Sequence, residues 1–559
     1  MTRGRGRVTR PPTSPGPATA GSVRRFFQYG GLLVLDVVSA VGLSGLLAAA
    51  LDTIAGRGVA REVLARNLVW LTVGLPLLVL VVRWARRSQQ DPTEGTSLAR
   101  SLYLSAACLV SLGVVALSLH DLLAWVLGQR APAVSSAATL LVWGSFWGVH
   151  ERIVARSADT RAFRPLLVLG SIAGLVLGGL GFGVVLAGAL ERWFGLPSDV
   201  LLAGRHDEVR AGLATLVVGV LVWWWYWIRQ LRDAERDDLW HAYVVLVAMA
   251  GSLLTLLSAG TLAAYRMAAW LLGRPGTSDA DSYFATMPEL VAAAVTGALV
   301  LGYHRQVLRA RVPSKRSEVD RVRDYVMAGI ALATAAAGAC VLVAAAAEGL
   351  TGKRTPSHTA VDTALAGVVL LAAGAPLWAF HWRSARRAAK SDPQDEVASV
   401  TRRAYLFLVL GLSSLAAVAA LLAGGFVVVS DILAGRVGAA TLDGSRYPLG
   451  ILCAAGAAAA GHWVVYQHDR TVAGSRRGPR FVLLLGVGDP AMARSLAHRW
   501  RCTVLFWTLP DQRPQPRSEN DVLALVEGSG ALEQVVVQAD DGALRSLRVE
   551  RSAPPPFGA

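Results

Sequence analysis

The most constraining feature of this chain of 559 residues is a series of apolar runs, each long enough to cross a lipid bilayer. A helix needs about 20 residues to span the hydrocarbon core. Lipid offers no partner to backbone polar groups, and the runs lack the alternation of barrel strands, so we expect helices. The approximate spans are 25–50, 66–84, 101–127, 134–152, 164–190, 210–229, 240–264, 288–305, 325–347, 361–382, 404–428 and 447–467. The sequence therefore predicts an all-α polytopic membrane protein with about twelve transmembrane helices.

Composition and charge agree with this class and point to lipid as the first partner. Only 17% of the residues are charged, whereas soluble domains have about 25%. The net charge is +16, but the arginines lie in short bursts between apolar runs, where anionic headgroups are the nearest acceptors. We expect a lipid bilayer with anionic headgroups as partner and no nucleic acid. Arginine far outnumbers lysine, as is typical of bacterial genomes of high GC content.

Similar phrases recur at the start of every second run, about 80 residues apart. Examples are "RRFFQYGGLL" at 24–33, "TRAFRPLLVLG" at 160–170 and "TRRAYLFLVLG" at 401–411. The aligned aromatic residues are Phe27, Tyr103, Phe163, Tyr243, Tyr325 and Tyr405. Fixed-period similarity of this kind indicates a repeated structural unit. We predict six two-helix hairpins, with the boundaries 23–95, 96–158, 159–236, 237–318, 319–396 and 397–470.

Aromatic and basic residues end every second helix of the predicted hairpins. The phrases "PLLVLVVRWARR" at 76–87 and "PLWAFHWRSARR" at 376–387 superpose without a gap. Trp prefers the headgroup region, and Arg lifts its guanidinium from the acyl chains into the phosphates. These residues are therefore predicted membrane-interface anchors: Arg83, Trp147, Arg152, Trp224, Arg229, Arg305, Trp378, His381, Arg383 and Trp463.

The orientation in the membrane follows from the basic residues of the loops. Loops between the predicted hairpins hold about twice as many Lys and Arg as loops within them. Cytoplasmic loops carry the excess of positive charge. We expect a multi-pass protein of the bacterial plasma membrane with both termini in the cytoplasm.

The unit of two basic residues, an aromatic residue, two apolar helices and a final "PLWAFHWRSARR" resembles a known membrane repeat. It is similar to the family catalogued as domain of unknown function 5671, which occurs in bacterial integral membrane proteins. The resemblance covers roughly residues 22 to 470. It weakens in the fourth hairpin, where "GALVLGYHRQ" lacks the Pro and the Trp, and in the sixth, where His468 replaces the last Arg. The family implies a multi-pass location and contributes no catalytic residue.

Asp36 is the candidate ion or proton site, because it lies within the first apolar run between "LLVL" and "VVSA". A charged group within a membrane helix is costly and therefore marks function by default. The alternative is a neutral Asp, or one that bonds a Ser or the backbone of a neighbouring helix. Whether Asp36 faces a wet cavity or a dry helix contact decides between these interpretations.

A second set of acidic residues is predicted at the outer ends of the helices that open the hairpins: Asp52, Asp121, Glu191, Glu348 and Asp431. This column fits a surface that gathers cations, or else interfacial helix ends followed by short amphipathic stretches. His150, His304, His381 and His462 lie in the anchor phrases without acids at ligand spacing. The four cysteines form no framework. We therefore expect no metal site and no cofactor.

The two ends of the chain differ from the apolar middle. Residues 1–22 form a basic arm with little to bury, which predicts disorder. Residues 480–552 predict a small cytoplasmic α/β module: a strand at "RFVLLLGV", a helix, a strand at "CTVLFWTL", and a hairpin that turns at Asp541 and Gly542. "GVGDP" after the first strand is a turn without the further glycine of a dinucleotide loop. The module is a candidate docking platform for a cytoplasmic protein.

Two functions from different classes fit these observations. The first is a membrane scaffold or sensor whose cytoplasmic module docks a partner, favoured by the scarcity of charge within the apolar runs. The second is a transporter or channel for a small solute or cation that uses Asp36, which internal repeats also suit. An enzyme is not expected, since no nucleophile, base and orienting group converge at a readable spacing.

Overall fold

The computed structural model describes residues 17–88, 97–129, 134–157, 159–194, 202–273, 279–309, 316–352, 359–474, 481–487, 489–500, 502–507, 518–529, 533–538 and 544–548. Most of the predicted basic arm, residues 1–16, lies outside this part, and so does the predicted turn at 541 and 542. The chain divides into two compact units, which comprise residues 1–385 with 412–456 and residues 386–411 with 457–559. Each unit is described by itself.

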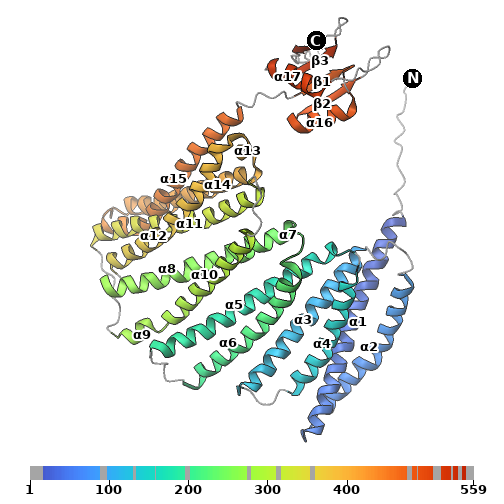
Figure 1. Cartoon of the computed structure of the whole chain (residues 1–559). Helices are drawn as coiled ribbons and strands as arrows, with labels where there is room; N and C mark the ends of the chain where they lie inside the picture. Colours follow the sequence, from blue (N-terminus) through green and yellow to red (C-terminus); the bar gives the residue numbers. More distant parts are fainter. Residues whose placement is uncertain are drawn as a thin grey trace, which may run out of the picture. The chain divides into compact units, whose positions relative to one another are not determined.

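Long helices make up almost all of the chain before residue 475 (Figure 1). They are α1 (Pro17–Ile54), α2 (Arg61–Ser88), α3 (Leu98–Val126), α4 (Val134–Ala155), α5 (Arg164–Phe194), α6 (Leu202–Trp223), α8 (Ala250–Leu272), α10 (Met287–Arg309), α11 (Glu318–Thr351), α12 (Ala360–Ser391), α14 (Val400–Leu433) and α15 (Ala439–Gly474). Shorter helical pieces are η1 (Arg161–Phe163), α7 (Asp238–His241), α9 (Ala280–Phe284) and α13 (Pro393–Ala398). Two π-helical segments, η2 (Trp224–Leu231) and η3 (Ala242–Met249), continue α6 and precede α8.

Local chemistry sets several helix ends. The Ser97 side chain accepts from the backbone N–H of Arg100 and so caps α3. Ser317 and Asp320 form a reciprocal capping box at the start of α11. Gly352 ends the same helix at φ 62°, a left-handed conformation that glycine adopts without strain. α1 begins at Pro17, within the stretch that the sequence assigns to the arm.

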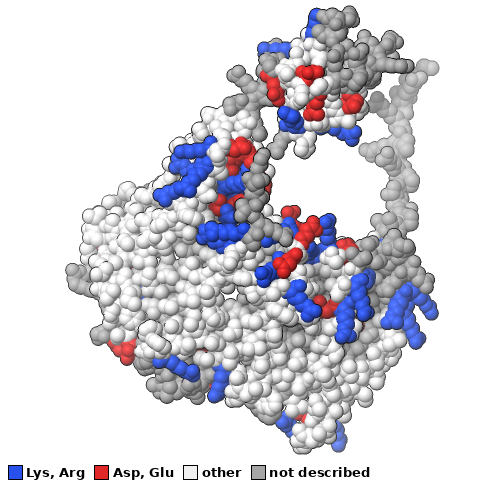
Figure 2. Space-filling model, in the orientation of Figure 1, with Lys and Arg blue, Asp and Glu red and all other residues white. Residues whose placement is uncertain are grey.

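Eleven helical segments among the described residues are long and apolar enough to cross a membrane. The predicted run at 134–152 does form a helix, α4, but it is not one of the eleven, because its Ser, Thr, His and Glu side chains lower its mean hydropathy. On the face shown in Figure 2, a broad surface over the helices of the first unit carries neither acidic nor basic residues, and charged side chains gather at helix ends. These observations are compatible with a multi-pass membrane protein. The count of twelve spans stays a prediction.

Consecutive helices of the first unit pack side by side: α1 on α2, α3 on α4, α5 on α6, and α8 on α10 (Figure 1). The backbones of α5 and α6 approach closely, since a Cβ added at Gly174 would lie 2.3 Å from the backbone nitrogen of Trp223. Small residues allow membrane helices to approach in this way. α1 also contacts α3 and α4, which brings the first two predicted hairpins together.

The buried core of the first unit is aromatic where α5, η2 and η3 meet. Trp227, Trp240, Tyr226 and Tyr243 are each 0% exposed. Their polar atoms are paired: Trp227 Nε1 donates to the Tyr303 hydroxyl at 3.0 Å, and Trp240 Nε1 donates to a backbone carbonyl. A buried indole or phenol needs such partners.

The second unit contains a small α/β fold with strand order β2-β1-β3-β4. β1 (Phe481–Leu485) pairs in parallel with β2 (Thr503–Trp507) and with β3 (Glu533–Gln538), and β4 (Leu544–Arg548) pairs antiparallel with β3. α16 (Pro490–Trp500) and α17 (Glu519–Ser529) connect the parallel strands. The predicted strands, first helix and final strand pair are present, whereas α17 was not predicted.

Candidate proton or cation site

Asp36 lies in α1 and is 5% exposed, with its carboxylate turned toward α3 and α4. The Tyr103 hydroxyl of α3 donates to Asp36 Oδ2 at 2.6 Å. His150 of α4 places Nε2 3.0 Å from the same hydroxyl and 3.7 Å from Asp36 Oδ2. Three helices of the first two predicted hairpins thus supply one buried polar cluster.

The hydrogen count of this cluster is short by one proton when Asp36 is ionised and His150 is neutral. His150 Nδ1 lies 2.9 Å from the Phe146 carbonyl, which only accepts, so Nδ1 carries a hydrogen and Nε2 of the neutral ring is an acceptor. Tyr103 has one hydroxyl hydrogen and faces two acceptors. One added proton satisfies all three groups, either on His150 Nε2 or on Asp36, and Tyr103 connects these two positions.

A cavity of about 680 Å³ adjoins the cluster. Asp36, Tyr103 and His150 line it, together with apolar residues of α1, α2 and α4. Ser39 also lines it, and its buried Oγ has no hydrogen-bond partner. A water molecule occupies about 30 Å³, so the volume is sufficient for several. Arg86 and Arg100 lie in the same wall and add positive charge near the helix ends.

A tyrosine and a histidine recur at the corresponding place of other helix pairs. The Tyr405 hydroxyl of α14 lies 3.2 Å from His462 Nε2 of α15, and His462 Nδ1 lies 2.8 Å from the Ala458 carbonyl. Here a neutral histidine is satisfied by the tyrosine proton. Tyr243 and His304 form a third pair, with ring centroids 5.8 Å apart. In the Tyr103 pair, the tyrosine hydroxyl also lies within hydrogen-bond distance of a carboxylate, that of Asp36.

The structure separates the predicted anchors into two groups. Arg83, Arg152, Trp224, Arg229, Arg383 and Trp463 are exposed. Trp147, Arg305, Trp378 and His381 are half-buried. Trp147 Nε1 donates to the buried Tyr226 hydroxyl at 3.0 Å, so this indole is tied to a helix contact. In "WWWYW" only Trp224 is exposed, whereas Tyr226 and Trp227 belong to the core.

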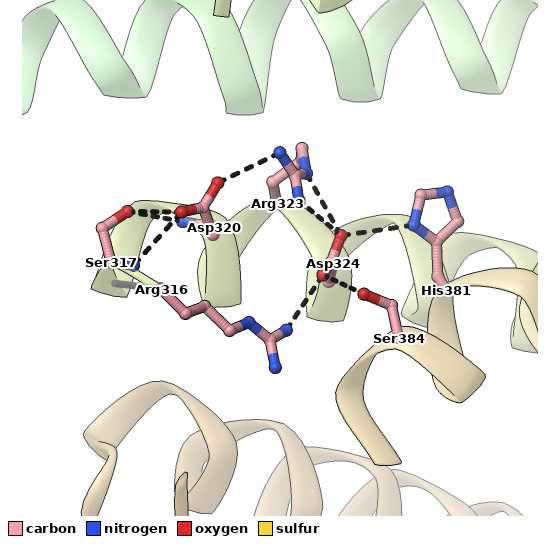
Figure 3. A network of polar contacts seen from close by, with 7 residues as sticks. All are labelled: Arg316, Ser317, Asp320, Arg323, Asp324, His381 and Ser384. Carbon is pink, nitrogen blue, oxygen red and sulfur yellow. Dashed lines mark hydrogen bonds and ion pairs between the residues drawn. The ribbon is translucent and has the colours of Figure 1, made fainter. Parts of the chain in front are cut away.

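His381 belongs to a polar network between α11 and α12 (Figure 3). The network centres on Asp324, which is 3% exposed. Arg316 Nη2 and Arg323 Nη2 donate to Asp324 at 2.9 and 3.0 Å. The Ser384 hydroxyl donates at 3.1 Å, and His381 Nδ1 lies 3.5 Å from Asp324 Oδ1. With two guanidinium groups and one hydroxyl on one carboxylate, this network ties the two helices together as a structural contact.

The predicted outer acids have local partners. Asp52 accepts from Arg57 Nη1 at 3.1 Å within the loop that follows α1. Three further acids accept a hydrogen bond from a hydroxyl of the next long helix: Asp121 from Ser136 at 3.4 Å, Glu348 from Thr363 at 3.0 Å and Asp431 from Thr441 at 2.8 Å. Glu191, at the end of α5, is half-buried. Three of the acids thus close a helix pair at one end. Among the described residues, no three His, Cys, Asp or Glu side chains form a group suited to a metal ion.

The sequence analysis did not predict the contacts of three buried polar side chains of the first unit. Tyr103 was a helix-opening aromatic residue and His150 an interfacial residue, yet both face Asp36. Glu151 was not singled out, but it is 7% exposed and accepts from the Tyr226 hydroxyl at 2.6 Å. The recurrence of Tyr in one helix and His in the next was the available signal, because consecutive helices of a hairpin are neighbours.

In the α/β fold, "GVGDP" forms the connection from β1 to α16. Gly486 has φ 69°, which favours glycine, and its N–H donates to the Trp507 carbonyl at 2.8 Å. The Asp489 carboxylate accepts from the backbone N–H of Met492 at 2.7 Å and caps α16. The turn interpretation of this stretch therefore has a local structural cause.

Comparison with known proteins identifies the repeat. The model of the family described as domain of unknown function (DUF5671) matches residues 25–159, 164–317 and 321–457. This chain belongs to the DUF5671 family. The predicted resemblance is confirmed. Each DUF5671 match spans four of the long helices, so it covers two predicted hairpins. No curated protein and no solved structure matches the chain.

The three DUF5671 segments differ at the candidate site. When Phe27, Phe163 and Tyr325 are superposed, the position of Asp36 is occupied by Ile172 in the second segment and by Thr334 in the third. The carboxylate is therefore a property of the first DUF5671 segment. The description of the family assigns no activity.

Proposed function

We propose that this protein is a multi-pass protein of a bacterial plasma membrane that moves protons or small cations through the cluster of Asp36, Tyr103 and His150. Twelve helices in six hairpins, with α4 as the least apolar span, form three four-helix DUF5671 segments in this proposal. The excess of basic residues in the loops between hairpins places both termini in the cytoplasm. Anionic headgroups are the partners of the helix-end arginines.

The observation that carries the proposal is the cavity beside Asp36. An isolated buried carboxylate in an apolar contact is a structural residue, whereas one that lines a space of about 680 Å³ has access to water or a solute. The hydrogen-bond geometry adds a chemical reason, since the Tyr103 hydroxyl lies between Asp36 Oδ2 and His150 Nε2 and so connects two groups that can each hold a proton.

The test is proton and cation flux in proteoliposomes, followed with a pH-sensitive dye enclosed in the vesicles. We expect flux in the wild type and a loss of roughly tenfold or more in Asp36→Asn, because the amide cannot exchange a proton. Tyr103→Phe, which removes the connecting hydroxyl, is expected to lower flux as well.

Asp52→Asn is the matched control. It is the same substitution in the same helix, but the Asp52 side chain is partly exposed at the helix end. Flux that is equal in wild type and Asp36→Asn, or wild-type vesicles that behave like empty ones, would contradict the transport function. Thermal unfolding of each variant separates loss of flux from loss of fold.

A membrane scaffold or sensor is the second candidate, and the α/β fold after residue 480 supports it. β1, β2 and β3 form the parallel part of the sheet. In parallel sheets, binding surfaces lie at the carboxyl ends of the strands. Affinity capture would compare the full chain with one that ends at residue 474. A cytoplasmic protein retained by the full chain alone, in the absence of flux, would favour the scaffold.

A further inference from the structure

A second cavity, of about 260 Å³, lies between α5, α6 and α10 and shares no lining residue with the cavity at Asp36. Gly178 and Gly179 of α5 form part of one wall. Trp223, Tyr303 and His304 contribute aromatic rings to the others. The cavity is otherwise apolar, and an engineered apolar cavity of about 150 Å³ already holds a benzene ring. This space is thus large enough for a substituted ring.

His304 supplies a single unsatisfied acceptor to this apolar space. The residue is 0% exposed and lines the cavity. Its Nδ1 lies 2.9 Å from the Val300 carbonyl, which only accepts, so Nδ1 carries the hydrogen. Nε2 is then an acceptor, and it has no hydrogen-bond partner. A buried acceptor left alone costs roughly 1–3 kcal/mol and so calls for an explanation.

Comparison with His150 and His462 shows which hydrogen-bond donor His304 lacks. Nε2 of His150 and Nε2 of His462 each lie within 3.2 Å of a tyrosine hydroxyl. The corresponding Tyr243 belongs to the π-helical segment η3, and its hydroxyl accepts from Trp223 Nε1 at 3.1 Å. π-Helical turns are rare and occur frequently at functional sites. The donor that other helix pairs supply from the protein is thus absent from His304.

We propose that this cavity binds the ring of an apolar phenol, whose hydroxyl donates to His304 Nε2. Phenols and hydroquinones that partition into a membrane share this chemistry. The ring would pack on the aromatic wall formed by Trp223 and Tyr303, where offset or edge contacts are favourable. The cavity shares no lining residue with the one at Asp36, so the proposal does not rest on ion movement there.

The experiment uses the full chain in lipid nanodiscs and a photoreactive alkylphenol that carries a diazirine in its tail. Unlabelled 4-hexylphenol and its methyl ether compete for labelling, and mass spectrometry locates the labelled peptides. The two competitors differ only in the hydroxyl hydrogen. We expect labelling on α5 or α10, and we expect the phenol to compete about tenfold better than the ether.

Two variants test the parts of the site separately. Gly179→Leu fills the cavity, and a Cβ at this position meets only the Thr296 methyl group, at 3.7 Å, so the fold is expected to persist while labelling falls about tenfold. His304→Leu keeps an apolar side chain and is expected to abolish the preference for the phenol over the ether. Gly302→Leu is the matched control, since it adds the same side chain to α10 at an exposed position with open space.

Equal competition by the phenol and the ether in wild type would overturn the proposal, and this comparison needs no variant to fold. Labelling that is unchanged in Gly179→Leu would overturn it as well. Labelling confined to other helices would show partition into the bilayer alone and reject the site.

Discussion

A tyrosine hydroxyl has one hydrogen, and at Tyr103 two acceptors lie within reach of it. The number of hydrogen-bond donors and acceptors around His150, rather than the presence of a charge, distinguishes this histidine from His304 and His462. At His462 the count closes with the protein alone. At His304 a donor is missing, and at His150 the tyrosine hydroxyl also faces the Asp36 carboxylate. The combination of a tyrosine and a histidine thus has three different hydrogen-bond arrangements, and the groups around each pair decide which one forms.

A buried ion pair in the second unit gives a residue-scale prediction. Arg402 donates to Asp469 through Nε at 2.6 Å and Nη2 at 2.9 Å, and both side chains are at most 10% exposed. Asp469→Ala would leave a buried guanidinium without its carboxylate. We expect a loss of about 3–5 kcal/mol in the free energy of unfolding.

The control is the double replacement of Arg402 by Met and Asp469 by Leu, which removes both charges together. Its loss of stability is expected to be smaller than that of Asp469→Ala, because both charges of the pair are removed together. Chemical denaturation in detergent measures both. A double variant that is less stable than the single one would reject this account.

At the scale of elements, the contact between α5 and α6 offers a test in which both partners are glycine. A Cβ at Gly219 would lie 2.1 Å from the backbone nitrogen of Gly178, whereas a Cβ at Gly178 would find its nearest atom at 3.6 Å. We expect Gly219→Ala to force the helices apart and cost about 1–3 kcal/mol. Gly178→Ala is expected to be tolerated. Thermal unfolding of the two variants side by side decides, and equal shifts would contradict the packing shown by the structure.

The sequence predicts the elements better than their contacts. Aromatic residues at a near-constant spacing and the superposable phrases at 76–87 and 376–387 indicated the repeat, which the DUF5671 matches confirm as a longer, four-helix segment. Hydrophobic periodicity carries no information on which hairpin packs on which, so the approach of α4 to Asp36 was not predictable. The π-helical segments were also missed, because nothing in the propensity of "WWYWIRQL" separates a π-helix from an α-helix.

The histidines show why the candidate site was only partly predicted. A histidine at the end of an apolar run has the pattern of an interfacial residue, and burial depends on helices that are distant in sequence. His150 is 4% exposed because α1 and α3 cover it. Asp36 itself was predictable, since its charge interrupts an apolar run. The missing information was its partners.

At the scale of the whole molecule, the orientation in the membrane is open to direct measurement. We expect a Cys introduced at Gly58, in the loop within the first hairpin, to react with an impermeant maleimide in intact cells. A Cys introduced at Asp233, in a loop between hairpins and 89% exposed at its side chain, is expected to react only after permeabilisation. Replacement of the four native cysteines by Ser removes background labelling. The opposite labelling pattern would invert the proposed topology.

The three DUF5671 segments match the same family model, yet only the first has a carboxylate at the superposed position of Asp36. A repeated fold can carry the same functional residue in each copy. Here the helical segment is repeated, but the carboxylate at the position of Asp36 is not. At the superposed positions of the other two segments, Ile172 and Thr334 carry no carboxylate that could replace Asp36. If Asp36 moves protons or cations as proposed, substitutions in the first segment are expected to affect function more than substitutions at the superposed positions of the other two.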